Sequence, residues 1–314
     1  MQKVVFSGPI PKPAAALLAR SYHIVNAWDE TALCAALADA EGLLALLSLR
    51  VDERLLNWGP RLRVVANFAV GYDNIDVAAC SRRGIVVVNT PDVLTETTAD
   101  LTWALLLAVA RRIPEADRKV RSREWKGFAP DFMLGREVYG KTLGIVGLGR
   151  IGRAVARRAL GFGMLILYTG RRPVPETPFE FVSLERLLTE SDFVTLHCAL
   201  GPTTRHLIGA EELARMKKGA ALINTARGPL VDENALAEWV VYGGRAALDV
   251  FENEPNVHPL LLASENVVLA PHIGSATVET RDRMAELAAA GIDDVLAGRQ
   301  PAHPVNPEVL GSLG

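Results

Sequence analysis

Three polar side chains follow three neighbouring apolar segments in the last third of the chain. Arg227 comes just after residues 221–224, Glu254 after residues 247–250, and His272 after residues 267–270. If these segments are strands of one parallel sheet, their carboxyl ends meet at one edge, which is where open α/β sheets bind ligands. We therefore expect an arginine, a carboxylate and a histidine in a single crevice.

This set of side chains suits hydride transfer to or from C2 of a small 2-oxo or 2-hydroxy acid. A guanidinium can hold the substrate carboxylate, and an imidazolium can give a proton to the carbonyl oxygen. A nearby carboxylate favours the charged imidazole. We assign these roles to Arg227, His272 and Glu254. Taken singly, each also has a structural explanation, as an interface arginine, a capping histidine and a loop charge.

A glycine-rich loop indicates where a dinucleotide would bind. The run Gly147-Leu148-Gly149-Arg150-Ile151-Gly152 follows the apolar segment 143–146 and opens a predicted helix over residues 154–160. In such a loop the first glycine permits a tight turn, the second lets the backbone approach a pyrophosphate, and the third lets helix and strand pack closely. The free amides of the helix then face the phosphates. An isolated GxGxxG is weak evidence, but its place between a strand and a helix strengthens it.

The next predicted strand, residues 165–168, ends in Thr169-Gly170-Arg171-Arg172. An NAD-specific site would usually carry Asp or Glu there to bind the ribose hydroxyls. Two guanidinium groups can instead bind a 2′-phosphate through charge-assisted bonds. We therefore predict a preference for NADP(H), with NAD(H) as the other candidate. The structural alternative is that Arg171 and Arg172 only face solvent.

The elements that must position these residues form two series of strands alternating with helices. The first series covers residues 4–6, 43–47, 64–66 and 85–88, and the second covers 142–146, 165–168, 193–196, 221–224, 247–250 and 267–270. Such alternation is typical of α/β folds with parallel sheets, and 314 residues exceed what one core usually supports. We predict two doubly wound domains. A Rossmann cofactor domain (98–274) is inserted into a flavodoxin-like substrate domain (1–97 and 275–314), which reclaims the final helix, 278–296.

Composition limits the partners and the compartment. The chain is 49% hydrophobic and 22% charged, and its formal charge of −2 gives no indication of nucleic acid or an anionic membrane as partner. Cysteines number three, Cys34, Cys80 and Cys198, which favours a reducing compartment. Pro9 interrupts the N-terminal segment before a signal peptide can develop, so we expect a cytoplasmic protein.

The most apolar segment, residues 99–110, is too short to span a bilayer and predicts a buried helix. It is apolar around most of its circumference, and one small domain cannot cover every side of such a helix. We therefore expect a homodimer built on it.

Six ordered segments resemble the D-isomer-specific 2-hydroxyacid dehydrogenase family. They are residues 70–76, 89–95, 147–152, 224–228, 248–251 and 271–277, and the match covers nearly the whole chain. Within the family the chain is most similar to the glyoxylate and hydroxypyruvate reductases, through residues 90–96, 138–142 and 168–172.

The resemblance implies roles for residues at matching positions. Arg227, Glu254 and His272 would be catalytic. Substrate contacts would come from Leu47, Ser48, Val70, Gly71, Arg227, His272 and Ser275. Cofactor contacts would come from Gly147, Leu148, Gly149, Arg150, Ile151, Gly152, Arg171, Arg172, Thr225, Asp249 and Gly274. For Asp249 a purely structural role is as well supported, and no metal site is implied. The expected reaction is NADPH-preferring reduction of glyoxylate or hydroxypyruvate.

Departures from the family pattern leave the substrate open. Residues 242–247 form a short connection, Ala199 replaces a frequent proline, and Phe128 stands where some glyoxylate reductases have tryptophan. The substrate depends on how far a cleft closes over Leu47, Ser48 and Phe128. Alternatives are a 2-ketogluconate reductase, a phosphoglycerate dehydrogenase, a formate or phosphite dehydrogenase, and a nucleotide-sensing corepressor. Glu254 disfavours the formate enzymes, which typically pair their histidine with glutamine.

Overall fold

The computed structural model describes residues 1–9 and 12–312, and the chain divides into two compact units. One unit comprises Met1–Leu94 and Ser275–Gly314, and the other comprises Thr95–Gly274. The chain thus passes from the first unit to the second after Leu94, three residues before the predicted boundary after residue 97. It returns to the first unit between residues 274 and 275. Residues 10–11 and 313–314 of the predicted substrate domain lie outside the described residues.

The first unit contains a five-stranded parallel sheet in the order β2-β1-β3-β4-β5. Its strands are β1 (Lys3–Phe6), β2 (His23–Asn26), β3 (Gly42–Ala45), β4 (Val64–Asn67) and β5 (Val86–Val88). This order is that of flavodoxin-like folds, and it confirms the predicted architecture. Strand β2 was not predicted because it is partly exposed and lacks a continuous apolar run.

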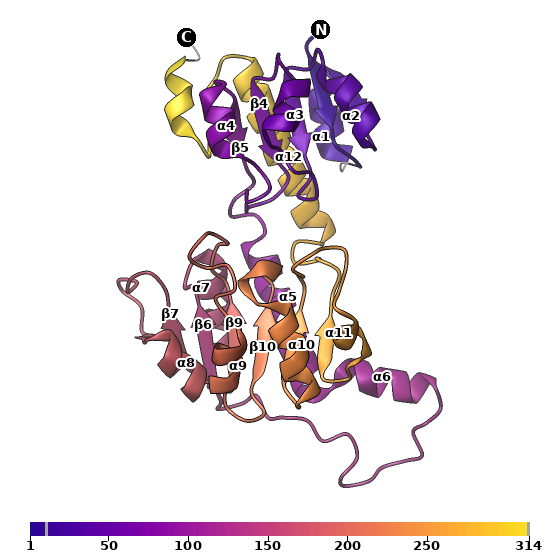
Figure 1. The fold of residues 1–314 in the computed structure, drawn as a ribbon, viewed down its shortest axis with the longest axis vertical. Helices are drawn as coiled ribbons and strands as arrows, with labels where there is room; N and C mark the ends of the chain where they lie inside the picture. The colour runs from indigo at the N-terminus through magenta and orange to yellow at the C-terminus, as the bar shows by residue number, and fades with distance from the viewer. Residues whose placement is uncertain (10–11, 313–314) are drawn as a thin grey trace. The chain divides into compact units, whose positions relative to one another are not determined.

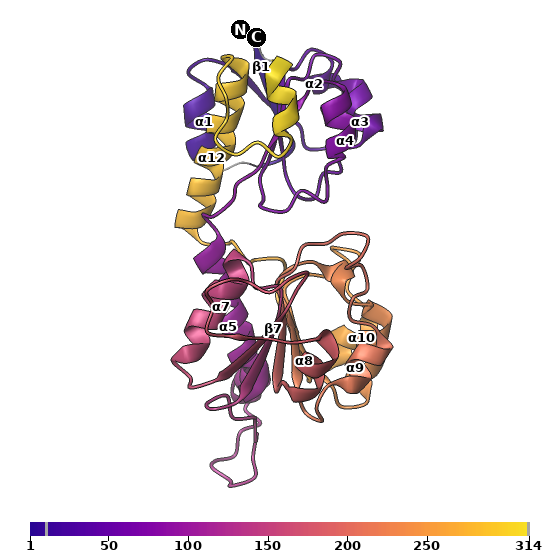
Figure 2. The same ribbon diagram turned by 90° about the vertical axis from the view of Figure 1, so that its left-hand side faces the viewer.

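Helices cover this sheet, and the C-terminal segment returns to it. Helices α1 (Lys12–Leu18), α2 (Glu30–Leu37), α3 (Glu53–Trp58) and α4 (Val77–Arg82) connect the strands, and α12 (Val278–Leu296) packs against α1, β3 and β4 (Figures 1 and 2). A Cβ atom on Gly291 would lie 2.8 Å from Cγ2 of Val88, so glycine lets α12 approach β5 closely. Farther on, the Asn306 side chain accepts the amide of Val87 at 2.7 Å and donates to the carbonyl of Ile85 at 2.9 Å. A short 3-10 helix, η2 (Pro307–Ser312), follows.

The second unit contains a seven-stranded parallel sheet in the order β12-β11-β10-β9-β6-β7-β8. Its strands are β6 (Thr142–Val146), β7 (Leu165–Thr169), β8 (Glu180–Phe181), β9 (Phe193–Leu196), β10 (Ala221–Asn224), β11 (Arg245–Leu248) and β12 (Val267–Leu269). The order confirms a Rossmann fold with one added strand. The two-residue strand β8 is exposed and was not predicted, and β11 begins two residues before the predicted segment.

The helices of this unit are α5 (Thr95–Arg111), α6 (Ile113–Arg121), α7 (Arg150–Leu160), α8 (Leu184–Glu190), α9 (Ala210–Arg215), α10 (Glu233–Val241) and α11 (Pro259–Ala263), with the 3-10 helix η1 (Gly228–Leu230).

Helix α5 packs against α7, β10 and β11 inside its own unit. The Trp103 ring stacks on Phe162 at 4.6 Å between ring centres, and Leu106 is fully buried. The premise that one domain cannot cover this helix is therefore wrong, because its own unit buries most of its apolar surface. No helix among the described residues is long and apolar enough to cross a membrane.

Helix α6 and the following segment, residues 122–141, extend away from the sheet (Figure 1). Several large apolar side chains on them are exposed, among them Trp125 at 54%, Phe128 at 92% and Leu134 at 63%. We call residues 113–141 the arm. Monomeric soluble proteins rarely gather so many exposed apolar side chains in one segment.

Candidate active site

The loop after β10 presents Arg227 and packs directly on the loop after β11. Asn224, the last residue of β10, accepts the amide of Ala226 at 3.0 Å and donates to the carbonyl of Arg227 at 2.8 Å, so the turn is fixed from within. A Cβ atom on Gly228 would overlap the carbonyl of Phe251 and lie 2.5 Å from the amide nitrogen of Glu252. Only glycine permits this backbone contact, and it brings the charge of Arg227 close enough to act on Glu254.

Glu254 and His272 form a hydrogen-bonded pair. Oε2 of Glu254 lies 2.8 Å from Nδ1 of His272, and Oε1 accepts the amide of Phe251 at 3.1 Å. Burial raises the pKa of the Glu254 carboxyl, but the bond and charge of His272, the Phe251 amide and the charge of Arg227 together lower it below its ordinary value. Glu254 is therefore a carboxylate at neutral pH, oriented toward the imidazole.

The histidine loop is held by Asp249, at the end of β11. The buried Asp249 carboxylate accepts the amides of Ile273 at 2.7 Å and Gly274 at 2.8 Å. The backbone carbonyl of Asp249 accepts the amide of His272 at 2.8 Å. Burial raises the pKa of Asp249, and these two carboxylate bonds oppose the rise. His272 has φ 55°, a left-handed conformation that residues other than glycine rarely adopt and that persists only where the surrounding structure holds it. The hydrogen bonds to Asp249 help to hold it.

The glycine loop has the shape that a pyrophosphate requires. Gly147 has φ 97°, and a Cβ atom there would lie 2.8 Å from the amide of Cys198. A Cβ atom on Gly152 would overlap the carbonyl oxygen of Gly147, so the turn and helix α7 pack too closely for any side chain. By contrast, nothing lies within 4 Å of the Cβ position of Gly149, and no side chain caps the amino end of α7. Leu148 is buried, whereas Arg150 and Ile151 begin the helix. An anionic diphosphate fits this open space and these helix amides.

Residues 170–172, directly after β7, include two arginines and no carboxylate. Arg171 and Arg172 are both exposed, and within residues 1–9 and 12–312 neither forms an ion pair. The adjoining turn is anchored by Tyr168, whose buried hydroxyl accepts the amide of Val174 at 2.9 Å. Two guanidinium groups thus stand on a fixed turn without a carboxylate between them.

Thr225, an expected cofactor contact, is buried, and its hydroxyl faces helix α5. Its hydroxyl lies 2.8 Å from the hydroxyl of Thr102 on α5, and Thr102 in turn donates to the carbonyl of Thr98 at 2.8 Å. Thr98 also donates to the carbonyl of Gly274 at 3.1 Å. These bonds tie the turn after β10 and the loop after β12 to helix α5.

In the first unit, the expected substrate contacts lie on turns after β3 and β4. Leu47 is half-buried and Ser48 is exposed. The carbonyl of Val70 accepts the side chain of Asn89 at 2.7 Å, and the carbonyl of Gly71 accepts that of Asn67 at 2.6 Å. Among the described residues no acceptor lies against the amides of Val70 and Gly71, so both can bind an anion.

Known proteins of one family match both the sequence and the fold. The model of the D-isomer-specific 2-hydroxyacid dehydrogenase NAD-binding domain matches residues 103–274, more than half of the chain. A glyoxylate reductase from Thermococcus kodakarensis is 49% identical, over 98% of this chain and 97% of that protein. One from Korarchaeum cryptofilum is 54% identical, over 87% and 84%. The chain belongs to the D-isomer-specific 2-hydroxyacid dehydrogenases.

Solved structures agree with this membership. An NADPH-dependent glyoxylate/hydroxypyruvate reductase from Sinorhizobium meliloti, in complex with NADP and malonate, has a TM-score of 0.90 and 35% identity and covers 97% of this chain and 96% of that one. A protein from Thermus thermophilus has a TM-score of 0.92 and 44% identity, over 97% and 100%. This dehydrogenase is therefore an NAD(P)-dependent oxidoreductase.

Several residues that shape the dehydrogenase site were not singled out from the sequence. Asn67, Asn89, Asn224 and Gly228 orient the backbone of the two strand-end regions. The signal was available, because these residues stand in or beside the segments that resemble the family. Their function depends on contacts between distant segments, which spacing along one segment does not reveal.

Phe128 was expected at the substrate cleft, and this expectation is wrong within one chain. It belongs to the arm, which runs from α6 to the beginning of β6 and so lies at the amino-terminal edge of the sheet (Figure 1). Arg227, Glu254 and His272 follow the carboxyl ends of their strands, at the opposite edge.

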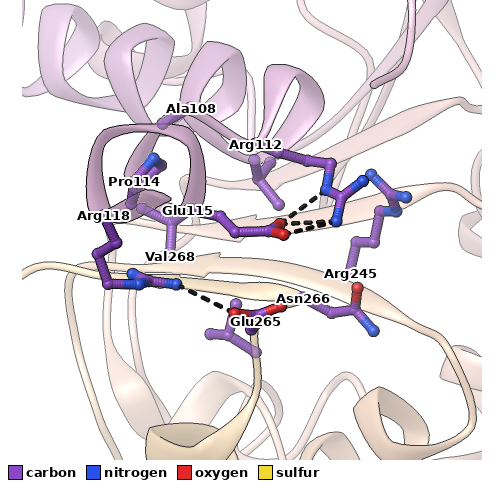
Figure 3. A pocket seen from close by; sticks show the side chains of 11 residues that line it. Ala108, Arg112, Pro114, Glu115, Arg118, Arg245, Glu265, Asn266 and Val268 are labelled. Atoms are coloured by element: carbon purple, nitrogen blue, oxygen red, sulfur yellow. Dashed lines mark hydrogen bonds and ion pairs between the residues drawn. The ribbon is translucent and has the colours of Figure 1, made fainter. Parts of the chain in front are cut away.

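A small cavity of about 10 Å³ also lies at the amino-terminal edge, away from these residues (Figure 3). There Arg112 donates two bonds of 2.8 Å to the buried carboxylate of Glu115. Burial and the charges of Arg136 and Arg112 lower the pKa of Arg245, the first residue of β11. This cluster anchors α6 to the sheet and belongs to the base of the arm.

Proposed function

We propose that the protein reduces glyoxylate or hydroxypyruvate to the corresponding 2-hydroxy acid, preferring NADPH, with His272 as proton donor. The observation that carries the proposal is the 2.8 Å bond between Nδ1 of His272 and the carboxylate of Glu254. The names of the Thermococcus and Sinorhizobium relatives support the substrate class.

The residues of this chain act on the substrate as follows. Arg227 binds the carboxylate and polarises the carbonyl, since a planar guanidinium matches a carboxylate bidentately. His272, engaged through Nδ1 by Glu254, gives the proton on Nε2 to the carbonyl oxygen. The amides of Val70 and Gly71, with Leu47, Ser48 and Ser275, bind the rest of the acid. A bound nicotinamide supplies the hydride.

Arg171 and Arg172 support the preference for NADPH. They stand where an NAD enzyme carries an acid, and neither has an anionic partner among the described residues. The cradle formed by Gly149 and the amino end of α7 would hold the pyrophosphate of either cofactor. Comparing kcat/KM with NADPH and NADH, for wild type, Arg171→Ala and Arg172→Ala, tests this part. Equal or NADH-favouring values in the wild type would overturn it.

The homodimer remains part of the proposal, but with a different contact surface. Helix α5 is covered within its own unit, whereas the arm exposes Trp125, Phe128 and Leu134. These side chains are the better candidates for contact with a second copy.

A substrate panel tests the reaction itself. Glyoxylate, hydroxypyruvate, 2-ketogluconate and 3-phosphohydroxypyruvate are compared by kcat/KM with NADPH. The highest value for either of the first two supports the proposal. A maximum for 2-ketogluconate or the phosphorylated acid would assign another 2-hydroxyacid dehydrogenase activity. Tight NADPH binding with negligible turnover of all four would instead indicate a nucleotide sensor.

The proton donor is tested through pH. Reduction requires a protonated His272, so its rate falls as pH rises. Glu254→Gln keeps the shape of the side chain but removes the charge that favours the imidazolium, and the fall should begin at a lower pH than in the wild type. Oxidation of the 2-hydroxy acid, which needs neutral imidazole, should tolerate the change better near pH 7. The alkaline limb is the part of the pH profile where the rate of reduction falls as pH rises. If this limb lies at the same pH in the wild type and in Glu254→Gln, Glu254 does not have this role.

A further inference from the structure

The loop that presents Glu254 is held at both ends by a single carboxylate. Glu233, the first residue of α10, accepts the amide of Glu252 through Oε2 at 2.7 Å and the amide of His258 through Oε1 at 2.8 Å. The segment between these two amides contains Glu254. Helix α11, which follows this segment, lies beside α10 (Figure 1).

The side chain of Glu252 in turn bonds the backbone of Glu233 and also contacts a third segment, residues 205–206. Its Oε2 accepts the amide of Glu233 at 3.4 Å, while its Oε1 lies 2.8 Å from Nη2 of Arg205 and 2.6 Å from Nε2 of His206. The side chain of Glu252 is only 13% exposed. Charge-assisted bonds of this kind are stronger than neutral ones, so the loop is tied to α10 and to the segment after β9.

We propose that Glu233 is a positioning residue for the acid–base pair. Its carboxylate fixes the loop from Glu252 to His258 so that Glu254 stays within hydrogen-bond distance of His272. None of its contacts above is to Arg227, Glu254 or His272 themselves, so it acts through the backbone. The inference rests on the proposed function, because it assumes that Glu254 acts on His272 during the reaction.

A carboxylate is required at this position because both of its oxygens accept an amide. Glutamine has nearly the same shape but only one acceptor oxygen, and its NH2 group would face the second amide. Glu233→Gln therefore replaces one of the two bonds by a contact between two donors and leaves a partly buried N–H without an acceptor. The loop can relieve this contact only by moving.

The test compares Glu233→Gln with Glu238→Gln, an exposed glutamate on the same helix. We expect Glu233→Gln to lower kcat/KM for glyoxylate roughly tenfold, mainly through kcat, and to move the alkaline limb of reduction toward that of Glu254→Gln. In the Glu254→Gln background the same substitution should cost less than threefold, because the pair it positions is already lost. Glu238→Gln should match the wild type. A tenfold loss in both backgrounds with an unmoved limb would overturn the proposal.

A second pair of variants keeps the test decisive if Glu233→Gln folds poorly. His258 has φ −57°, which proline can adopt, so His258→Pro removes one of the two amide donors without forcing φ to change. His258→Ala loses the same imidazole but keeps the amide. We expect only His258→Pro to shift the alkaline limb. If Glu254→Gln itself leaves the limb in place, the role proposed for Glu254 in the reaction fails; if it moves the limb and neither Glu233→Gln nor His258→Pro does, only the positioning role of Glu233 fails.

Discussion

Replacing Gly228 by alanine should separate the two loops that carry Arg227 and Glu254. A Cβ atom at this position lies 2.5 Å from the amide nitrogen of Glu252 and overlaps the carbonyl of Phe251, and both are backbone atoms that cannot rotate away. Ordinary contact begins at 3.4 Å, and the overlap with Phe251 is tighter than the contact with Glu252, so one loop must move by more than 1 Å. A misplacement of that size can cost roughly 100-fold in rate, and overpacking of this kind costs about 1–3 kcal/mol of stability.

The assay is kcat/KM for glyoxylate with NADPH, together with the melting temperature and the NADPH dissociation constant. Gly161→Ala is the matched control, because Gly161 has φ −65° and its Cβ would meet only Arg158 at 3.4 Å. The control should keep full activity. Gly228→Ala should lose about two orders of magnitude while still binding NADPH, whose glycine loop is not affected. If it keeps more than a tenth of the wild-type efficiency, the contact between the loops does not set the geometry of the site.

Three further outcomes follow from the same structure. Arg227→Lys should lose roughly 100-fold in kcat/KM, because an ammonium cannot match a carboxylate bidentately; near-normal efficiency with weakened NADPH binding would make Arg227 a cofactor residue. Because the pKa of Glu254 is lowered in the folded protein, its ionised form adds stability above about pH 4.5 that is lost as pH falls through the lowered value. The melting temperatures of wild type and Glu254→Gln should therefore differ more at pH 6 than at pH 3.5, and a constant difference would contradict this linkage. Sedimentation should show a dimer for the wild type and a shift toward monomer for Trp125→Ser with Phe128→Ser, whereas an unchanged dimer would place the interface elsewhere.

The sequence predicted the architecture well, because each buried parallel strand is a short apolar run and each strand end is marked by a change to polar residues. Arg227, Glu254 and His272 could be placed at one sheet edge for this reason alone. Elements that lack this contrast were missed: β2 is half-exposed and β8 has two exposed residues.

Contacts between distant segments were harder to predict. The apolar circumference of α5 predicts a subunit contact, but a helix pattern does not say how many neighbours within the same unit cover the helix. Likewise, the Thr225 hydroxyl bonds that of Thr102, and the carboxylate of Glu233 accepts an amide of the loop that contains residue 254. Such contacts depend on how distant loops meet in space, which the periodicity of one segment does not reveal.

The order of the units along the chain has a consequence for synthesis. The first unit needs α12 to cover α1, β3 and β4, and it needs Asn306 to hold β5, yet these parts are made after the inserted unit. The inserted unit, residues 95–274, has all of its strands and helices before then. Although domains generally fold from the N-terminus during translation, here the later segment completes first. Until α12 is made, residues 1–94 lack the helix that covers α1, β3 and β4, so we expect this part of the nascent chain to expose apolar surface.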